Sequence, residues 1–335
     1  MRAAPPVEEV AAGAYRGFTM KALVWHGDRA LEVEQLPDPV AADDEVVLEV
    51  ELAGICGSDL HGYRGHPGPR VPPLVLGHEV VGRSDGRSYT LYPLVSCGSC
   101  ERCLAGEDNL CAAWRLIGMH RPGVFAERVV VPRRSLVRLP AGLESDRAVL
   151  AEPLACCVGA MRSLALPEDV RLLVLGCGPI GLLTVYLASR RGQEVTAVDP
   201  VEERRAHAQR LGAARVLASQ DDLEPASFDA AVDAAGFELT WRAAIGAVES
   251  GGTVVVIGLG QAEGGFPMAE VVRRSVSVRG QFAYTRADFA QAVAVLADGG
   301  LDLGWITEMP LDDGAQAFAN LVDLPAEYSK VLLRP

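Results

Sequence analysis

Two patterns of hydrophobic and polar residues divide the chain near residue 145. Before that point, short segments rich in β-branched and apolar residues are bounded by Gly, Pro and Asp, which is typical of strands. The sequence predicts strands at 20–27, 30–36, 45–55, 78–84, 123–132 and 135–140. Together they predict an antiparallel or partly open barrel with long loops.

Beyond residue 145 strands alternate with helices. We expect a helix over 144–166, and helices with apolar residues at helical spacing over 179–192 and 201–213. Apolar strands are expected at 171–176, 194–199, 214–219, 228–233, 252–258 and 276–282. This alternation predicts a Rossmann-type, doubly wound parallel sheet of six strands.

The length of 335 residues favours two domains. The expected division is a disordered N-terminal extension (1–19), a first, strand-rich domain (20–155), a second domain that holds the parallel sheet (156–295) and a C-terminal return to the first domain (296–335).

Composition and charge exclude several classes of protein. The net charge of −13 disfavours binding to a phosphate backbone, so no nucleic-acid partner is expected. No apolar run is long enough to span a bilayer, and the N-terminus has no signal-peptide core. We therefore expect a cytoplasmic protein without a membrane partner, in which clustered cysteines indicate metal binding or catalysis more than disulfides.

The segment "GCGPIG" follows a predicted strand and opens a predicted helix. Gly176 permits a tight turn, Gly178 lets the backbone approach a pyrophosphate, and Gly181 allows close packing of helix on strand. Pro179 and Ile180 complete this turn, whose helix N-terminus offers N–H groups to phosphates.

Asp199 ends the next predicted strand, 18 residues after Gly181. Its carboxylate can accept bonds from a ribose hydroxyl and would repel a 2′-phosphate, so the predicted cofactor is NAD. Arg204 and Arg205 follow closely and could admit a 2′-phosphate. Arg204 is included in the predicted cofactor site.

Four cysteines, Cys97, Cys100, Cys103 and Cys111, have the spacing C-x2-C-x2-C-x7-C. Such spacing can close a four-thiolate tetrahedron, which predicts a structural zinc site with no open position for substrate. An iron–sulfur cluster is the chemical competitor, but the bacterial ferredoxin run has x3 and a Pro at its end. A disulfide pair is the weakest alternative in a reduced compartment.

Candidate ligands also occur in "GICGSDLHGY" (54–63), "LGHEVVG" (76–82) and "AEPLACC" (151–157). Taken singly, Cys56, His78 and Glu152 each have an ordinary structural explanation. Taken together, and in this order with the four-cysteine lobe and "GCGPIG", these segments resemble the zinc-dependent medium-chain alcohol and polyol dehydrogenases. The resemblance extends from about Met20 to the C-terminus and is closest to the sorbitol dehydrogenase branch.

The resemblance implies a GroES-like β-barrel catalytic domain and two zinc ions per chain, one structural and one catalytic. It implies Cys56 and His78 as ligands of the catalytic zinc, with Glu79 as a ligand or nearby carboxylate. Glu152, where the alcohol dehydrogenases have a cysteine, would bind the metal or its water. Cys156 and Cys157, one helical turn further on, are less favoured alternatives.

Supporting roles also follow from the resemblance. Asp59 would orient the imidazole of His78. Ser58 would bond the substrate oxygen, and His61 would pass its proton toward solvent, as its ordinary pKa of about 6.5 permits. The implied reaction interconverts a secondary alcohol (polyol, sugar or cyclitol-like) and a ketone with NAD.

The substrate is less well defined by the sequence. Ala283 stands where sorbitol dehydrogenases have an arginine that touches the polyol, with Tyr284 and Arg286 nearby, which puts sorbitol itself in doubt. Arg64 and Arg70 near Cys56 permit an anionic substrate.

Two other functions stay open at this point. One is a zinc-independent NAD(P)H quinone or enoyl reductase of the same superfamily, and the other is a non-catalytic zinc module acting as a redox sensor or adaptor. The resemblance also implies a homodimer or homotetramer formed through the Rossmann domain, with 276–282 as a possible edge strand.

Overall fold

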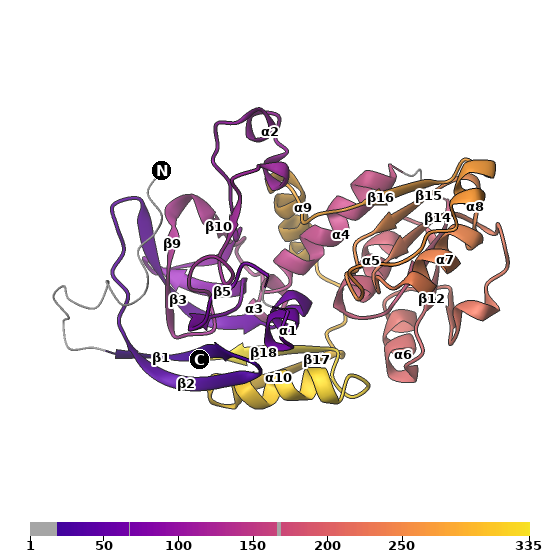
Figure 1. Ribbon diagram of the computed structural model, residues 1–335. Helices are drawn as coiled ribbons and strands as arrows, with labels where there is room; N and C mark the ends of the chain where they lie inside the picture. Colours follow the sequence, from indigo (N-terminus) through magenta and orange to yellow (C-terminus); the bar gives the residue numbers. More distant parts are fainter. Residues whose placement is uncertain (1–18, 67, 166–168) are drawn as a thin grey trace.

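The computed structural model describes residues 19–66, 68–165 and 169–335 and shows two domains on either side of helix α4 (Ala151–Leu164) (Figure 1). The predicted N-terminal extension lies outside the described residues, apart from Thr19, which begins the first strand.

The first domain is built around strand β3 (Glu45–Gly54). Its first half pairs antiparallel with β9 (Arg128–Pro132), and its second half with β5 (Glu79–Ser84) and β18 (Lys330–Arg334). The other strands of this domain are β1 (Thr19–Gly27), β2 (Ala30–Pro37), β4 (Leu74–Val75), β6 (Arg87–Leu91), β7 (Leu94–Val95), β8 (Arg115–Leu116), β10 (Leu136–Arg138) and β17 (Ile306–Pro310). Its helices are α1 (Gly57–Tyr63), α2 (Glu101–Leu104), η2 (Asp108–Leu110), η3 (Arg133–Ser135), α3 (Ser145–Ala148), η5 (Leu311–Asp313) and α10 (Gly314–Asp323).

The C-terminal segment is part of the core of this first domain. Strands β17 and β18 are parallel to each other, and β18 pairs with β3. Phe318 of α10 packs its ring 5.3 Å from that of Tyr63 and 5.8 Å from that of Phe125. Tyr63, Phe125 and Phe318 therefore form one aromatic cluster that joins α10 to the rest of the domain.

The second domain is a six-stranded parallel sheet with the order β13-β12-β11-β14-β15-β16. The residues Leu172 and Val174 of β11 face a core shared with α4 and α5, whereas Leu173 and Leu175 face a core shared with α7. This alternation covers both faces of the sheet with helices. The elements are β11 (Arg171–Leu175), α5 (Pro179–Arg190), β12 (Glu194–Val198), α6 (Glu202–Arg210), β13 (Arg215–Leu217), η4 (Gln220–Asp222), β14 (Phe228–Asp233), α7 (Glu238–Ala247), β15 (Val248–Val256), α8 (Met268–Arg273), β16 (Ser277–Gly280) and α9 (Arg286–Ala297).

Three local predictions differ from the structure. The strand expected at 123–132 begins only at Arg128, because the N–H groups of 123–125 donate to the carbonyls of 75–77 in a loop arrangement. The helix expected over 144–166 is interrupted between α3 and α4 near Leu150. Strand β6 was not predicted, although Asp85 and Gly86, both with positive φ, form the Asp-Gly turn that joins β5 to β6.

Helix length bears on the membrane prediction. Within the described ranges, no helix combines the length and the apolar character needed to cross a bilayer.

Candidate active site and metal centres

Cys56 lies at the end of β3, where the chain turns into helix α1. It is the N-cap residue of α1, with φ −91° and ψ 152°. The carboxylate of Asp59, three residues into the turn, accepts a hydrogen bond from the N–H of Cys56 at 3.1 Å. This bond fixes the backbone that carries the Cys56 thiol at the start of the helix.

His78 directly precedes β5 and is buried against Asp59. Its Nδ1 lies 3.6 Å from Oδ1 of Asp59, and both side chains are almost fully enclosed. Desolvation by burial lowers the pKa of His78, but the charge of Asp59 and the thiol of Cys56 outweigh it and raise the pKa to about 10. Because Nδ1 faces Asp59, the other ring nitrogen is left for the ligand side.

Glu152 lies in the first turn of α4 and is also buried. The hydroxyl of Tyr284 donates to its Oε1 at 2.6 Å. Burial raises the pKa of Glu152, and the nearby charge of His78 works in the opposite direction. The three predicted ligands, Cys56, His78 and Glu152, are thus delivered to one neighbourhood by three separate elements.

Glu79 forms an ion pair with Lys330, with each side chain 1% exposed. Lys330 also donates to the carbonyl oxygen of Ile55 at 2.8 Å. The Glu79 carboxylate sits where a Cβ on Gly54 would be, 2.1 Å from Oε2. Lys330 was not predicted from the sequence; the available signal was a lysine opening an apolar C-terminal strand.

The hydroxyl oxygen of Ser58 is buried without a hydrogen-bond partner within the described residues, whereas Asp59 Oδ1 and His78 Nδ1, which also make no hydrogen bond there, face each other at 3.6 Å. Unpartnered buried polar atoms are costly unless a ligand completes them. The donor types present (thiol, imidazole and carboxylate) suit zinc. In the described chain, however, Cys56, His78 and Glu152 are less tightly grouped than the four-cysteine lobe described below.

Basic groups surround the outer side of α1. Arg70 is buried with Nη2 3.7 Å from Oδ1 of Asp59. Burial lowers the pKa of His61, and the positive charges of Arg64 and Arg70 lower it further. His61, which is half-buried, is therefore a neutral proton acceptor at neutral pH.

Basic charge continues in the loop after β8. The pKa of His120 is lowered by burial first, then by Arg115 and Arg70. The ring of His120 meets that of Trp114 edge-on at 5.1 Å, and Trp114 lies 5.2 Å from Phe282 of the second domain. Arginine side chains therefore lower the pKa of both histidines, and one of these arginines, Arg70, also lies beside Asp59.

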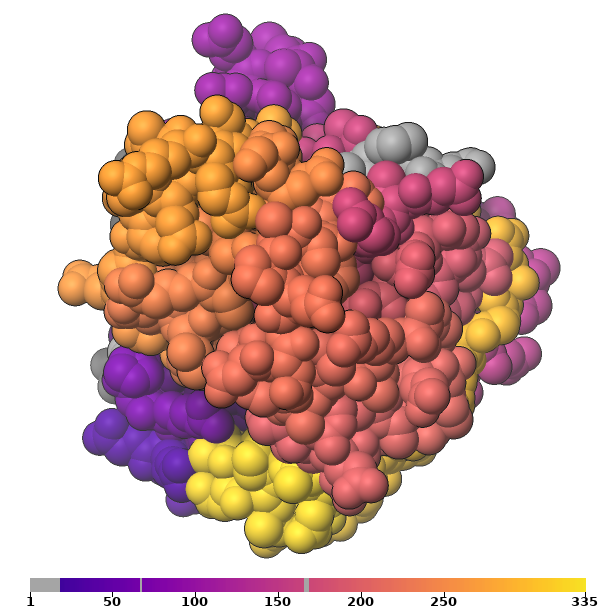
Figure 2. Space-filling view, turned by 90° about the vertical axis from the view of Figure 1, so that its right-hand side faces the viewer, coloured from indigo at the N-terminus to yellow at the C-terminus, as the bar shows by residue number. Residues whose placement is uncertain are grey.

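The sulfurs of Cys97, Cys100, Cys103 and Cys111 lie within 4.8 Å of one another, as the spacing predicted. The lobe that carries them projects from the surface, at the top of Figure 2 and beside α2 in Figure 1. Hydrogen bonds from the backbone N–H groups of Ser99 and Cys100 are the main cause that lowers the pKa of Cys97, to about 6. A lowered thiol pKa favours the thiolate that a metal requires.

The glycine-rich turn joins β11 to α5. Gly176 has φ +87°, and the Cβ of an alanine at Gly181 would lie 1.7 Å from the Gly176 carbonyl oxygen. A Cβ at Gly178, the N-cap of α5, would meet nothing within 4 Å. Pro179 and Ile180 form the first turn of α5. The open space at Gly178 lies at the N-terminus of α5, where the sequence predicts the pyrophosphate of a dinucleotide.

Asp199 follows β12 and closes this turn from the side. Its Oδ2 accepts from the N–H of Cys177 at 2.8 Å, and its Oδ1 from the N–H of Val201 at 2.9 Å. Arg204 is 4.0 Å from Asp199 and donates to the carbonyl of Pro325 at 2.6 Å. The Asp199 carboxylate is thus fixed at the edge of the predicted cofactor site, and Arg204 points toward the first domain.

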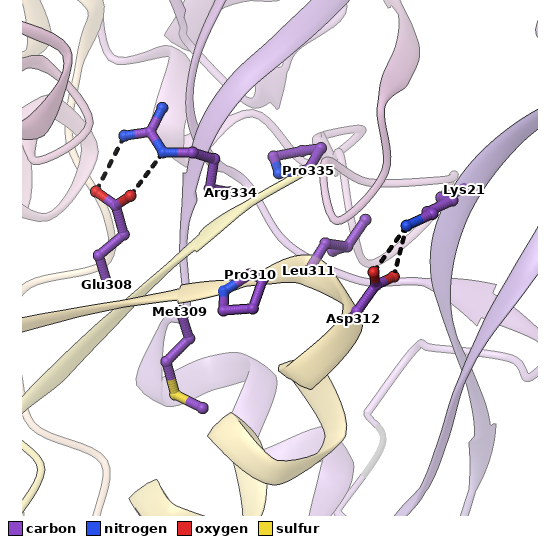
Figure 3. A pocket seen from close by; sticks show the side chains of 8 residues that line it. All are labelled: Lys21, Glu308, Met309, Pro310, Leu311, Asp312, Arg334 and Pro335. Atoms are coloured by element: carbon purple, nitrogen blue, oxygen red, sulfur yellow. Dashed lines mark hydrogen bonds and ion pairs between the residues drawn. The ribbon is translucent and has the colours of Figure 1, made fainter.

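A pocket of about 420 Å³ lies beside β17 and the chain end, apart from these groups (Figure 3). Arg334 pairs with Glu308 through two contacts of 2.6 and 3.0 Å, and Lys21 pairs with Asp312 at 2.7 Å. None of the predicted site residues that the structure describes lines this pocket. Because its charged side chains pair with one another, we assign no chemistry to this pocket.

A barrel-like domain joined to a six-stranded parallel dinucleotide-type sheet, with a four-cysteine lobe, defines a two-domain zinc-type oxidoreductase. The family "Alcohol dehydrogenase GroES-like domain" matches residues 42–141, and "Zinc-binding dehydrogenase" matches residues 179–298. The chain belongs to the zinc-binding medium-chain alcohol dehydrogenase family, whose members act on CH–OH groups with NAD(P).

Relatives named for different substrates match most of this chain. L-galactonate-5-dehydrogenase of Escherichia coli K12 is 31% identical over 302 residues, covering 84% of this chain and 88% of that protein. Sorbitol dehydrogenase of Halalkalibacterium halodurans is 30% identical over 346 residues, covering 94% and 99%. A solved zinc-binding dehydrogenase from Sinorhizobium meliloti 1021, bound to NADP, superposes with a TM-score of 0.87 at 31% identity, covering 95% and 100%.

Proposed function

We propose that this protein is a zinc- and NAD-dependent dehydrogenase that interconverts a secondary alcohol of the polyol or sugar class and the corresponding ketone. The observation that carries the proposal is that half-buried Cys56 and buried His78 and Glu152 lie in one neighbourhood, with the unpartnered hydroxyl oxygen of Ser58 beside them. The same features weigh against a zinc-independent reductase of the same superfamily and against a non-catalytic zinc module.

Two zinc ions per chain fit the residues present. Cys56, His78 and Glu152 would hold the first, and the four cysteines of the lobe the second. Glu79, which is paired with Lys330, is assigned as a nearby carboxylate that steadies the first site. When bound there, zinc supplies a Lewis acid that polarises an alcohol oxygen and lowers its pKa.

The side chains around α1 handle the proton. Ser58 Oγ is buried without a partner and can accept a hydrogen bond from the hydroxyl of an alcohol, releasing its own hydroxyl proton as it takes up that of the alcohol. His61, kept neutral by burial and by Arg64, can take that proton on toward solvent. The nicotinamide cofactor carries the hydride.

NAD is proposed over NADP because of Asp199. Its fixed carboxylate can accept bonds from ribose hydroxyls and would repel a 2′-phosphate. The Sinorhizobium relative is bound to NADP, so the choice needs a direct test. We expect kcat/KM with NAD to exceed kcat/KM with NADP in the unaltered protein. In the Asp199→Asn variant, the ratio of these two values should be smaller. Equal use of both cofactors by the unaltered protein would contradict the assignment.

A negatively charged polyol is the favoured substrate within this class. Arg64, Arg70 and Arg115 place positive charge around His61 and His120, close to Asp59. Such a patch attracts and orients an anion. Of the relatives, one is named for galactonate, a sugar acid, and another for neutral sorbitol.

Matched substrates test this preference. We expect Arg64→Gln to raise the KM for an aldonate such as galactonate and to leave that for sorbitol unchanged. Arg64→Lys, which keeps the charge, is the control. An equal rise for both substrates would show that the arginine acts on the fold or the metal rather than on substrate charge.

Metal content tests the proposed function most directly. Elemental mass spectrometry of the purified protein should give two zinc ions per chain, and His78→Ala should lose one zinc and turnover while remaining folded. A single zinc in the unaltered protein would favour the zinc-independent reductase, and iron would overturn the lobe assignment. A screen of polyols, aldonates and cyclitols for NAD reduction then identifies the substrate.

We also propose a cytoplasmic homodimer or homotetramer assembled through the second domain. Strand β16 is at the edge of the sheet and its four residues are exposed. Met268 and Val272 of the adjoining α8 are 60% and 71% exposed. An open strand edge beside apolar side chains suits pairing with a second copy. Light scattering should give a mass of two or four chains, and Val272→Glu should lower it.

A further inference from the structure

A buried chain of hydrogen bonds leads from the cysteine lobe to Glu152. The turn η2, between Cys103 and Cys111, presents Asp108, whose Oδ2 accepts from the hydroxyl of Tyr92 at 2.6 Å. The same hydroxyl lies 3.3 Å from the carbonyl oxygen of Tyr284. The hydroxyl of Tyr284 in turn donates to Glu152 at 2.6 Å.

Further contacts hold the lobe against residues 282–286. The side-chain amide of Asn109, next to Asp108, donates to the carbonyl of Phe282 at 2.8 Å. The N–H of Arg286 donates to Asp108 at 3.4 Å. The guanidinium of Arg286 also lies 3.8 Å from Asp108 and 4.3 Å above the ring of Tyr92. The turn η2 therefore contacts this segment on both sides of Tyr284, at Phe282 and at Arg286.

The segment 281–285 depends on such contacts to keep its conformation. Residues 281–285 belong to neither β16 nor α9, and Ala283 has φ +48°, a left-handed conformation that costs a non-glycine residue energy. Tyr284 can hold the Glu152 carboxylate in one place only if its own backbone is fixed. The lobe supplies part of this support, through Asp108 and Tyr92, beside the ring of Phe289 that packs on Tyr284.

We propose that the cysteine lobe sets the position of Glu152 through Asp108, Tyr92 and Tyr284, so that metal loading of the lobe strengthens metal retention at the Cys56–His78–Glu152 site. Tyr284 is a positioning residue, and Tyr92 and Asp108 act through it. The inference rests on the proposed function, because it takes Glu152 as a metal-holding group. The lobe is then a regulator of the first site as well as a stabiliser of its own loop.

The rate of zinc release to a chromophoric chelator, followed separately for the two sites, tests the proposal. We expect Tyr284→Phe to speed release from the Cys56–His78–Glu152 site by roughly ten- to hundredfold, the usual effect of removing an outer hydrogen-bond partner of a metal ligand. Tyr92→Phe should speed it less, and neither variant should change release from the lobe. Tyr186→Phe, which removes a buried hydroxyl bonded to the Gly299 carbonyl at 2.8 Å, is the matched control.

A double-variant cycle tests the coupling itself. Cys103→Ser, which unloads the lobe, should also speed release from the first site, and its effect should shrink in a Tyr92→Phe background because the link is already broken. Independent, additive effects would overturn the proposal, as would an unchanged first-site rate in Tyr92→Phe. If Cys103→Ser does not fold, Cys100→Ser, which removes another sulfur of the lobe, replaces it in the cycle. An unaltered protein with one zinc, or without NAD reduction, would instead contradict the proposed function.

Discussion

The buried pair of Lys330 and Glu79 gives the sharpest stability prediction. Each side chain is 1% exposed, and Lys330 is the sole cation that the structure places on Glu79 among the described residues. Replacing Lys330 by Met keeps a similar volume but leaves the Glu79 carboxylate enclosed without its partner. It also removes the donor to the Ile55 carbonyl oxygen, which Lys330 contacts at 2.8 Å.

Breaking a buried ion pair from one side costs about 3–5 kcal/mol, since the remaining charge cannot be solvated. Lys330→Met should therefore lower the free energy of unfolding by that amount. The double variant Lys330→Met/Glu79→Gln should recover most of the loss, because an amide carries no charge to leave unpaired. The two variants together separate the cost of an orphaned charge from the cost of changed packing.

Urea denaturation of the zinc-loaded protein, followed by far-UV circular dichroism, measures these differences. Lys21→Met is the matched control: it breaks the pair of Lys21 and Asp312, whose side chains are 41% and 58% exposed, and should have little effect. The reasoning would be refuted if Lys330→Met were as stable as Lys21→Met. It would fail equally if the double variant were no more stable than the single one.

Two further predictions concern the cofactor turn and the proton path. Gly178→Ala should leave the unfolding curve unchanged but raise the dissociation constant for NAD measured by calorimetry. Gly181→Ala should destabilise the fold, because its Cβ would lie 1.7 Å from a backbone oxygen. The opposite pattern would contradict this geometry. Burial and the charge of Arg64 lower the pKa of His61, so His61 stays a neutral proton acceptor below pH 6.5. The acid limb of the profile of kcat/KM against pH should therefore lie below the ordinary histidine pKa of about 6.5. Arg64→Gln should move the limb upward, and an unmoved limb would remove His61 from the path.

The overall architecture was predictable because it rests on local patterns. Runs such as 171–176 and 194–199 are apolar enough for buried parallel strands, and their order with the intervening helices predicts the doubly wound sheet. The four cysteines were predictable for a similar reason, since the short spacings between Cys97, Cys100 and Cys103 leave the chain little freedom.

The supports of the candidate site were not predictable, because they join residues far apart in the sequence. Lys330 meets Glu79 across 251 positions, and Tyr284 meets Glu152 across 132. The sequence drew attention to Tyr284 as a pocket neighbour but could not show that its hydroxyl reaches Glu152. Periodicity defines which face of an element is buried, and says nothing of which distant side chain it will meet.

These long-range partners explain how a site assembled from weak single motifs can be specific. Cys56 and His78 lie within the first domain, but Glu79 needs the last strand, β18, and Glu152 needs the segment before α9. The neighbourhood is therefore complete only when the C-terminal strand has joined β3 and the second domain has packed against the first. A metal that requires all of these groups binds the fully assembled protein in preference to partly folded forms, and by mass action it stabilises that assembly. The separate, self-contained cysteine lobe can close from residues 97–111 alone, which is why the sequence made it conspicuous although the chemistry is proposed elsewhere.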